Sequence, residues 1–160
     1  MMHRLFWGLF FVLLDIPVTV GRAEIEILPD FLGFFLLMKG MEAAASETGR
    51  FEKSRHVAFG LFLLSAVCYG ANLLNLKPMT EVAFWALELL CLAGFLWILR
   101  EVTAEGSEQL KTLRLIVGVV LVLGMLFGWM PLVGSICRTA ALVISSVFLL
   151  AFWKEMKSAE

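Results

Sequence analysis

Six apolar stretches separated by short charged connectors occupy most of the 160-residue chain. Hydrophobic residues make up 61% of the sequence, charged residues 17%, and the mean hydropathy is +0.90. A soluble domain of this length could not bury so much apolar surface in its core, so lipid is the expected solvent. The stretches run approximately over Leu5–Val20, Pro29–Ala45, Val57–Leu76, Glu81–Leu99, Leu113–Trp129 and Leu132–Trp153.

The expected fold class is all-α, a polytopic integral membrane helical bundle of about six transmembrane helices in a single domain, residues 1–160. A helix rises about 1.5 Å per residue and the hydrocarbon core is about 30 Å thick, so the last four stretches are long enough to cross it. The first two stretches are short. A re-entrant hairpin is the alternative for these two.

The first apolar stretch is interrupted by Asp15 and Pro17. Proline lacks an amide donor and disfavours helix at the residue before it, which predicts a kink or a helix end near Asp15. A cleaved signal peptide is a rival interpretation of this stretch, and an aspartate within the apolar run counts against it. Acidic residues and isoleucine alternate over Glu24–Ile27, a pattern that predicts a short extended connector.

Lysine and arginine gather in alternate connectors, ten on one side of the expected membrane and three on or toward the other. Because positive residues are retained in the cytosol, both termini are predicted to be cytosolic, in a multi-pass protein of the plasma membrane. The ten are Arg4, Lys39, Arg50, Lys53, Arg55, Arg100, Lys111, Arg114, Lys154 and Lys157, and the three are Arg22, Lys77 and Arg138.

The stretch Ile25–Met41, IEILPDFLGFFLLMKGM, carries the features of a helix start. Pro29 suits a first helical turn, where its missing donor costs nothing, and Asp30 favours the positive end of the helix dipole. Gly33 and Gly40 share one face of the expected helix. These two glycines are predicted to let a neighbouring helix approach closely.

The N-terminal run LLDIPVTVGRAEIEILPDFLGFFLLMKGM resembles a signature of small multi-pass membrane proteins of Gram-positive bacteria, a family of unknown function. In that family an aspartate ends the first apolar run, and an I-L-P-D-F-[IL]-G stretch opens the second. The matching residues here are Asp15 and Ile27–Gly33, and the resemblance covers roughly the first quarter of the chain. It implies a bacterial plasma-membrane location. It implies no activity, substrate or catalytic residue.

Several polar and ionisable residues fall inside the expected spans at similar depths. At about 1.5 Å per helical residue, Asp15 lies about 16 Å from the cytosolic edge, and Glu88 and Arg138 lie about 10 Å below the outer surface. Charges within a membrane are costly and are therefore functional hypotheses. The sequence predicts a polar cluster in the outer half of the bundle, formed by Asp15, Asp30, Tyr69, Asn72, Glu88 and Arg138.

This expected cluster has two interpretations. If Arg138 pairs with one carboxylate, the other must be protonated or neutralised by a bound cation, which makes a proton or cation site. Alternatively, Arg138 and Glu88 form a structural ion pair, while Asp15 caps a helix near interfacial water. The sequence leaves both open.

The positions of the cysteines and histidines do not indicate a catalytic or metal-binding site. The three cysteines lie far apart, each inside an apolar stretch, which predicts buried free thiols rather than a disulfide or zinc site. His3 and His56 lie at the cytosolic edge, away from the expected cluster. We therefore expect no catalytic site, no metal and no cofactor. Because the sequence has no basic patch, nucleic acid is not an expected partner.

The expected function is that of a small transporter or channel-like protein for a small ion or solute, with an outward-facing polar site. The alternative is a non-catalytic membrane partner subunit or regulator that acts through helix packing. Gly124 and Gly128 form a G-x-x-x-G pattern that permits close packing within the chain or with a second copy. The expected partners are the lipid bilayer and either a second copy or another membrane protein.

Overall fold

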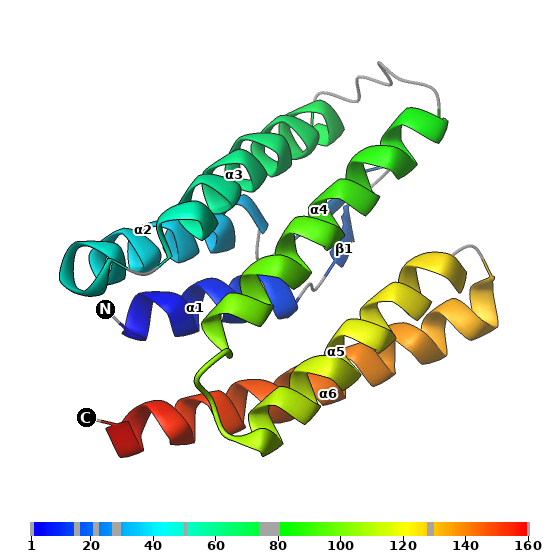
Figure 1. Ribbon diagram of the computed structural model, residues 1–160. Coiled ribbons are helices and arrows are strands. Elements are labelled where there is room, and N and C mark those ends of the chain that lie inside the picture. The colour runs from blue at the N-terminus through cyan, green and yellow to red at the C-terminus, as the bar shows by residue number, and fades with distance from the viewer. Residues whose placement is uncertain are drawn as a thin grey trace. The chain divides into compact units, whose positions relative to one another are not determined.

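The computed structural model describes the backbone of residues 2–14, 17–20, 23–26, 30–49, 51–73, 81–127 and 130–159, and the side chains of residues 3–14, 30–46, 49, 51–70, 86–127 and 130–158. Over these residues the chain forms six α-helices and one two-stranded ribbon (Figure 1). The predicted helical class is confirmed. In chain order the elements are α1 (Met2–Leu13), β1 (Pro17–Val20), β2 (Ala23–Glu26), α2 (Asp30–Thr48), α3 (Glu52–Leu73), α4 (Glu81–Val102), α5 (Glu108–Phe127) and α6 (Pro131–Ala159).

The first apolar stretch is a short helix followed by a strand rather than one long helix. α1 has 12 residues and ends at Leu13, so the helix end predicted near Asp15 is confirmed, although Asp15 itself lies outside the described residues. Pro17 explains the change, because it cannot donate an intrahelical hydrogen bond and sits well at the first residue of a strand. β1 starts at this proline.

The connector between α1 and α2 contains an antiparallel ribbon. Its register pairs Thr19 with Glu24 and Val18 with Ile25, so polar positions oppose polar ones and apolar positions oppose apolar ones. The extended conformation predicted from the alternating sequence is confirmed by β2, which ends at Glu26. α2 then begins at Asp30, where the sequence predicted a helix start.

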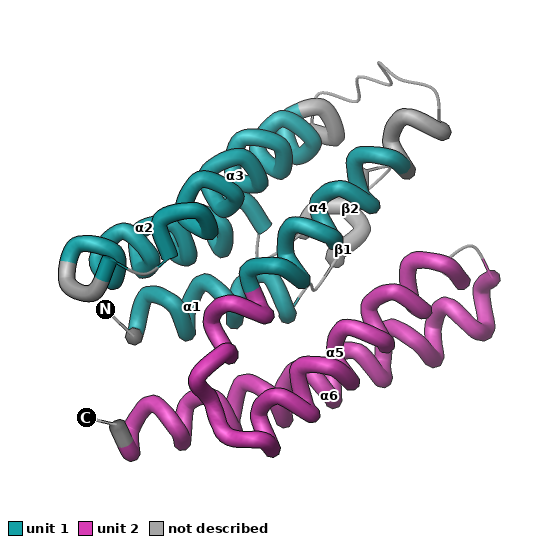
Figure 2. The backbone as a smooth tube through the Cα atoms, viewed as in Figure 1, with its two compact units in different colours: residues 1–98 teal, residues 99–160 magenta. Residues whose placement is uncertain are grey.

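The chain divides into two compact units, residues Met1–Ile98 (unit 1) and Leu99–Glu160 (unit 2), which Figure 2 shows in different colours. Each unit is described separately below. The single transmembrane domain expected over residues 1–160 stays a prediction.

In unit 1, α1 and α2 pack as an antiparallel pair whose backbones meet at glycines. A Cβ atom built on Gly33 would lie 2.5 Å from Cγ2 of Val12 and 2.9 Å from the carbonyl oxygen of Gly8. A Cβ on Gly40 would lie 2.8 Å from Cδ2 of Leu5. Side chains larger than hydrogen do not fit at these positions without a shift, so the glycines permit the close approach of the two helices.

Aromatic rings fix the remaining helices of unit 1. The ring of Phe35 on α2 lies 5.7 Å from that of Phe62 on α3, and Phe34 contacts Phe95 on α4 edge-on, with the ring centroids 6.2 Å apart. Such pairs add to the burial of apolar area. α3 and α4 meet where Gly94 faces Leu61, since a Cβ on Gly94 would lie 3.0 Å from Cδ1 of Leu61.

Unit 2 is built on the antiparallel pair α5 and α6, which run side by side in Figure 1. Val117 of α5 and Phe148 of α6 are fully buried. The turn between the helices is tight, because the amide of Met130 donates to the carbonyl of Phe127 at 3.0 Å and α6 begins at Pro131. Many other large side chains of the pair are exposed and apolar, including Leu115, Leu132, Ile136 and Leu150.

Within the described part of the chain, two helices are long and apolar enough to cross a membrane, one over Glu108–Phe127 and one over Pro131–Ser158. Their exposed apolar side chains suit contact with lipid. These features support membrane association. α1 is apolar but shorter than the hydrocarbon thickness, since its 12 residues span about 18 Å.

Candidate functional site

The structure places the expected cluster residues in different parts of the chain. Asp30, Tyr69 and Glu88 belong to unit 1, whereas Arg138 is an exposed residue of α6 in unit 2. Asp15, the side chain of Asn72 and the packing glycine Gly128 lie outside the described residues. The expectation that Arg138 joins the carboxylates of unit 1 stays a prediction.

The N-terminal end of α2 lies beside the later part of α3. Asp30 is the first residue of α2, and the ring of the next residue, Phe31, lies 5.4 Å from the ring of Tyr69. Phe31 also contacts Phe62, about two turns earlier on α3, at 6.5 Å. These contacts place the ring of Tyr69 beside the first turn of α2.

Two carboxylates and two thiols of unit 1 come within electrostatic range of one another. Cys91 on α4 interacts electrostatically with Cys68 on α3, with Asp30 on α2 and with Glu88 on its own helix. Cys68 also interacts with Glu88. Side-chain packing supports the neighbourhood of these helices: the ring of Phe31, next to Asp30, lies 5.4 Å from that of Tyr69, next to Cys68. Cys91 lies three residues before Gly94, which packs against Leu61 of α3. We call Asp30, Cys68, Glu88 and Cys91 the carboxylate–thiol cluster.

Sequence reasoning missed the two thiols of this cluster. It predicted that the cysteines are buried and free; they are free, but Cys68, Cys91 and Cys137 are only partly buried. For Cys68 and Cys91, their spacing from the polar residues of the expected cluster could have indicated that they lie near it. Cys91 follows Glu88 by three residues, which puts both on one helix face, and Cys68 directly precedes Tyr69.

Within the described part of unit 1, Glu88 makes no hydrogen bond or ion pair. The described basic side chains of this unit lie toward the other end of the helices, where α1 begins, α2 ends and α3 begins: His3, Arg4, Lys39, Lys53, Arg55 and His56. One of them, Lys39, forms an ion pair with Glu42 at 2.8 Å. Glu42 and Glu52 therefore lie among these basic residues, whereas Glu88 lies on another part of unit 1.

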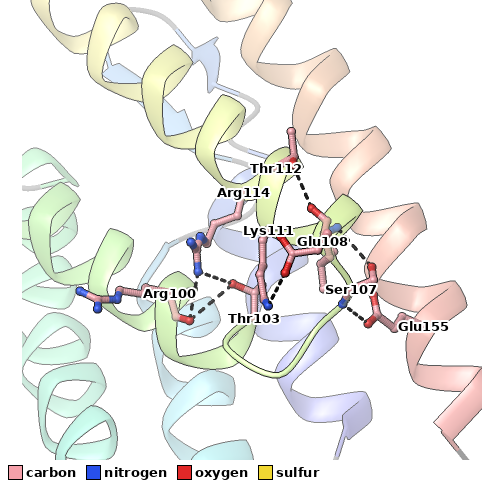
Figure 3. Close-up of polar contacts among 9 residues, drawn as sticks. Arg100, Thr103, Ser107, Glu108, Lys111, Thr112, Arg114 and Glu155 are labelled. Atoms are coloured by element: carbon pink, nitrogen blue, oxygen red, sulfur yellow. Dashed lines mark hydrogen bonds and ion pairs between the residues drawn. The ribbon is translucent and has the colours of Figure 1, made fainter.

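A second polar arrangement joins the α4–α5 connector to α6 within unit 2 (Figure 3). The backbone amide and the hydroxyl of Ser107 donate hydrogen bonds to the two carboxylate oxygens of Glu155, at 2.6 Å and 3.0 Å. Ser107 also caps α5, because its Oγ accepts from the amide of Leu110 at 3.3 Å and its carbonyl accepts from Lys111. α5 begins directly after this serine, at Glu108.

The end of α4 is held by Arg114 in the same region (Figure 3). Arg114 Nη1 donates to Oγ1 of Thr103 at 3.2 Å and to the carbonyl oxygen of Arg100 at 3.4 Å. The hydroxyl of Thr103 donates to the carbonyl of Leu99 at 2.7 Å. These bonds satisfy carbonyl groups that the last turn of a helix leaves without partners. Their role is structural.

Among the described residues, no group of three or more histidine, cysteine, aspartate or glutamate side chains could hold a metal ion. No protein-family model matches the chain, and neither a curated protein nor a solved structure matches it. The carboxylate–thiol cluster is therefore the candidate site on chemical grounds alone. The carboxylates there can accept a proton.

Proposed function

We propose that the chain is a multi-pass integral membrane protein that admits a small cation, or a proton, through an outward-facing polar site in unit 1. The observation that supports this proposal is that Asp30 on α2 and Glu88 on α4 both lie within electrostatic range of Cys91 on α4. The proposed topology has six membrane-crossing segments and cytosolic termini in the plasma membrane. Its support is the ten-to-three distribution of basic residues and the two membrane-length helices α5 and α6.

The site favours a cation because of the charge that it holds. In the proposed topology Glu88 lies about 10 Å below the outer surface, well inside the hydrocarbon core. A carboxylate at that depth is costly unless it is protonated or shares the site with a positive charge. A proton or small cation that enters the site supplies this positive charge. Because the site is partly exposed and its affinity for the cation is low, the cation can leave again.

Flux into proteoliposomes tests the proposal. The purified protein is reconstituted, and uptake of protons, sodium and potassium is followed with ion-sensitive dyes for the wild type, Glu88→Gln and the matched control Glu52→Gln. Glu52 is an exposed carboxylate in the first turn of α3, so its change alters the charge by the same amount outside the cluster. We expect flux in the wild type and control and only background leak in Glu88→Gln, with all three proteins eluting alike on size exclusion. Background leak in all three would contradict the proposal.

A second candidate function, that of a non-catalytic partner subunit, is favoured by one face of α3. A Cβ added to Gly60 or Gly70 would meet nothing within 4 Å. The side chains of Phe59, Leu63 and Val67, on the same part of α3, are exposed. Open glycines permit another helix to pack closely. Replacement of Gly60 by leucine would then shift the mass of the detergent-solubilised complex in native mass spectrometry without changing cation flux.

A further inference from the structure

The helices of the N-terminal hairpin are too short to reach from one membrane surface to the other. α1 has 12 residues and spans about 18 Å, against a hydrocarbon core of about 30 Å. α1 and α2 are antiparallel, with Leu5 beside Gly40 and Val12 beside Gly33, so the end of α1 and the start of α2 lie at one level. With the N-terminus on the cytosolic side, this level falls within the outer half of the membrane.

The ribbon lies between the two helices along the chain, so it starts and ends near this level. Each strand has four residues, which span about 13 Å, close to the thickness that α1 leaves uncrossed. The outer part of the hairpin is therefore β-structure at membrane depth.

A two-stranded ribbon cannot satisfy its own backbone in hydrocarbon. Pairing uses one edge of each strand, and the amides and carbonyls of the other edges need partners. Non-helical backbone at membrane depth is tolerated only where protein covers it or water reaches it. β2 lies beside α3, which covers part of the ribbon. β2 also contains Glu24 and Glu26, whose carboxylates would be costly in hydrocarbon without water.

We propose that the ribbon keeps water within the outer half of the membrane at unit 1, in a hydrated zone that reaches the carboxylate–thiol cluster and admits small cations in preference to anions. This inference rests on the proposed multi-pass topology. The cluster lies at the right depth, because Phe31, next to the start of α2, contacts Tyr69, which adjoins Cys68. The negative charge of Asp30 and Glu88 gives the zone its preference for cations.

The native cysteines provide the test. The variant Cys68→Ser/Cys137→Ser retains only Cys91, and Cys91→Ser/Cys137→Ser retains only Cys68. The matched control, Cys68→Ser/Cys91→Ser, retains Cys137, whose Cβ lies 3.9 Å from the position of a Cβ on Gly124 within the α5–α6 pair. Intact cells are treated with a membrane-impermeant cationic methanethiosulfonate or with its anionic sulfonate analogue, and the modified fraction is followed by mass spectrometry.

We expect Cys91 or Cys68 to react from outside while Cys137 stays unmodified until detergent is added. Modification of both cluster thiols only after detergent would overturn the inference. A cationic reagent that reacts at least about 10-fold faster than the anionic one supports the preference for cations. Equal rates would remove that preference and weaken the proposed cation function, while the hydrated zone would stand. Glu52→Cys in a cysteine-free variant reports the topology, since its labelling from outside would overturn both the topology and this inference.

Discussion

Ser107 and Glu155, 48 residues apart in sequence, are joined by two hydrogen bonds that use both carboxylate oxygens and both donors of the serine. The same hydroxyl oxygen caps α5 by accepting from the amide of Leu110. One serine therefore starts α5 and also holds the connector before it against α6. Gly106 lies directly beside this contact, since a Cβ there would lie 2.7 Å from Cδ2 of Leu110 and 3.5 Å from Oε1 of Glu155.

Replacement of Ser107 by alanine should destabilise unit 2. The variant loses the helix cap and the hydroxyl bond to Glu155, and loss of a serine cap alone costs about 1 kcal/mol. Thermal unfolding of the detergent-solubilised protein measures the change. The control Ser158→Ala removes an exposed hydroxyl that donates only to the carbonyl of Glu155 in its own helix, and it should unfold near the wild-type temperature. Equal midpoints for the two variants would show that the Ser107–Glu155 contact contributes nothing.

Replacement of Gly33 by alanine should destabilise the α1–α2 pair. The new methyl group would meet Val12 and the carbonyl oxygen of Gly8, and because one of these is backbone, the helices must separate. Overpacking of this kind costs about 1–3 kcal/mol. Urea or thermal unfolding in detergent measures it.

Gly60→Ala is the matched control for this change, because it adds the same methyl group to a helix where nothing lies within 4 Å. Alanine favours helix over glycine by about 1 kcal/mol, so this variant should be as stable as the wild type or more so. A similar loss of stability in both variants would mean that close packing at Gly33 is not the cause.

Replacement of Thr103 by valine should destabilise the end of α4. Thr103 is fully buried, and valine keeps its shape while removing the hydroxyl that donates to Leu99 and accepts from Arg114. The loss of a buried hydrogen-bonding group costs about 1–3 kcal/mol. Thr112→Val is the control, because the exposed hydroxyl of Thr112 donates only to the carbonyl of Glu108 within α5. An unfolding midpoint for Thr103→Val that matches this control would contradict the expected role of the buried hydroxyl.

Sequence alone predicted the features that local chemistry decides. Pro17 marks the end of the first helix, and a glycine at position 49 is typical of the residue that follows a helix. Gly49 indeed has a φ of 69° and follows the last residue of α2, where a left-handed conformation favours glycine. The alternation of Glu24–Ile27 predicted the extended connector that β2 forms. Each of these signals acts within a few residues of its own position.

Contacts between distant residues could not be predicted in the same way. The approach of Gly8 to Gly33 depends on how two helices cross, and many pairs of glycines would satisfy the same pattern. The contact of Gly94 with Leu61 likewise depends on the packing of α3 against α4. Counting residues along each expected helix placed Asp30, Tyr69 and Glu88 at similar depths in the membrane. Such a count does not show which residues of other helices pack against the face that carries each of them.

For Ser145 we expect a substitution to stabilise the protein, in contrast to the destabilising changes above. It is 1% exposed, and its Oγ has no hydrogen-bond partner among the described residues. A buried hydroxyl without a partner costs free energy, so Ser145→Ala should stabilise the protein, by up to about 1 kcal/mol. A rise in the thermal unfolding midpoint in detergent measures the effect.

The neighbouring residue supplies the control for this prediction, because Ser146 is exposed and its hydroxyl donates to the carbonyl of Leu142 at 2.7 Å. Ser146→Ala removes a satisfied hydroxyl, and its midpoint should stay close to that of the wild type. The same serine-to-alanine change one residue apart thus separates the cost of an unsatisfied hydroxyl from any general effect of serine in α6. A lower midpoint for Ser145→Ala than for Ser146→Ala would mean that the Ser145 hydroxyl is stabilising, and the prediction would fail.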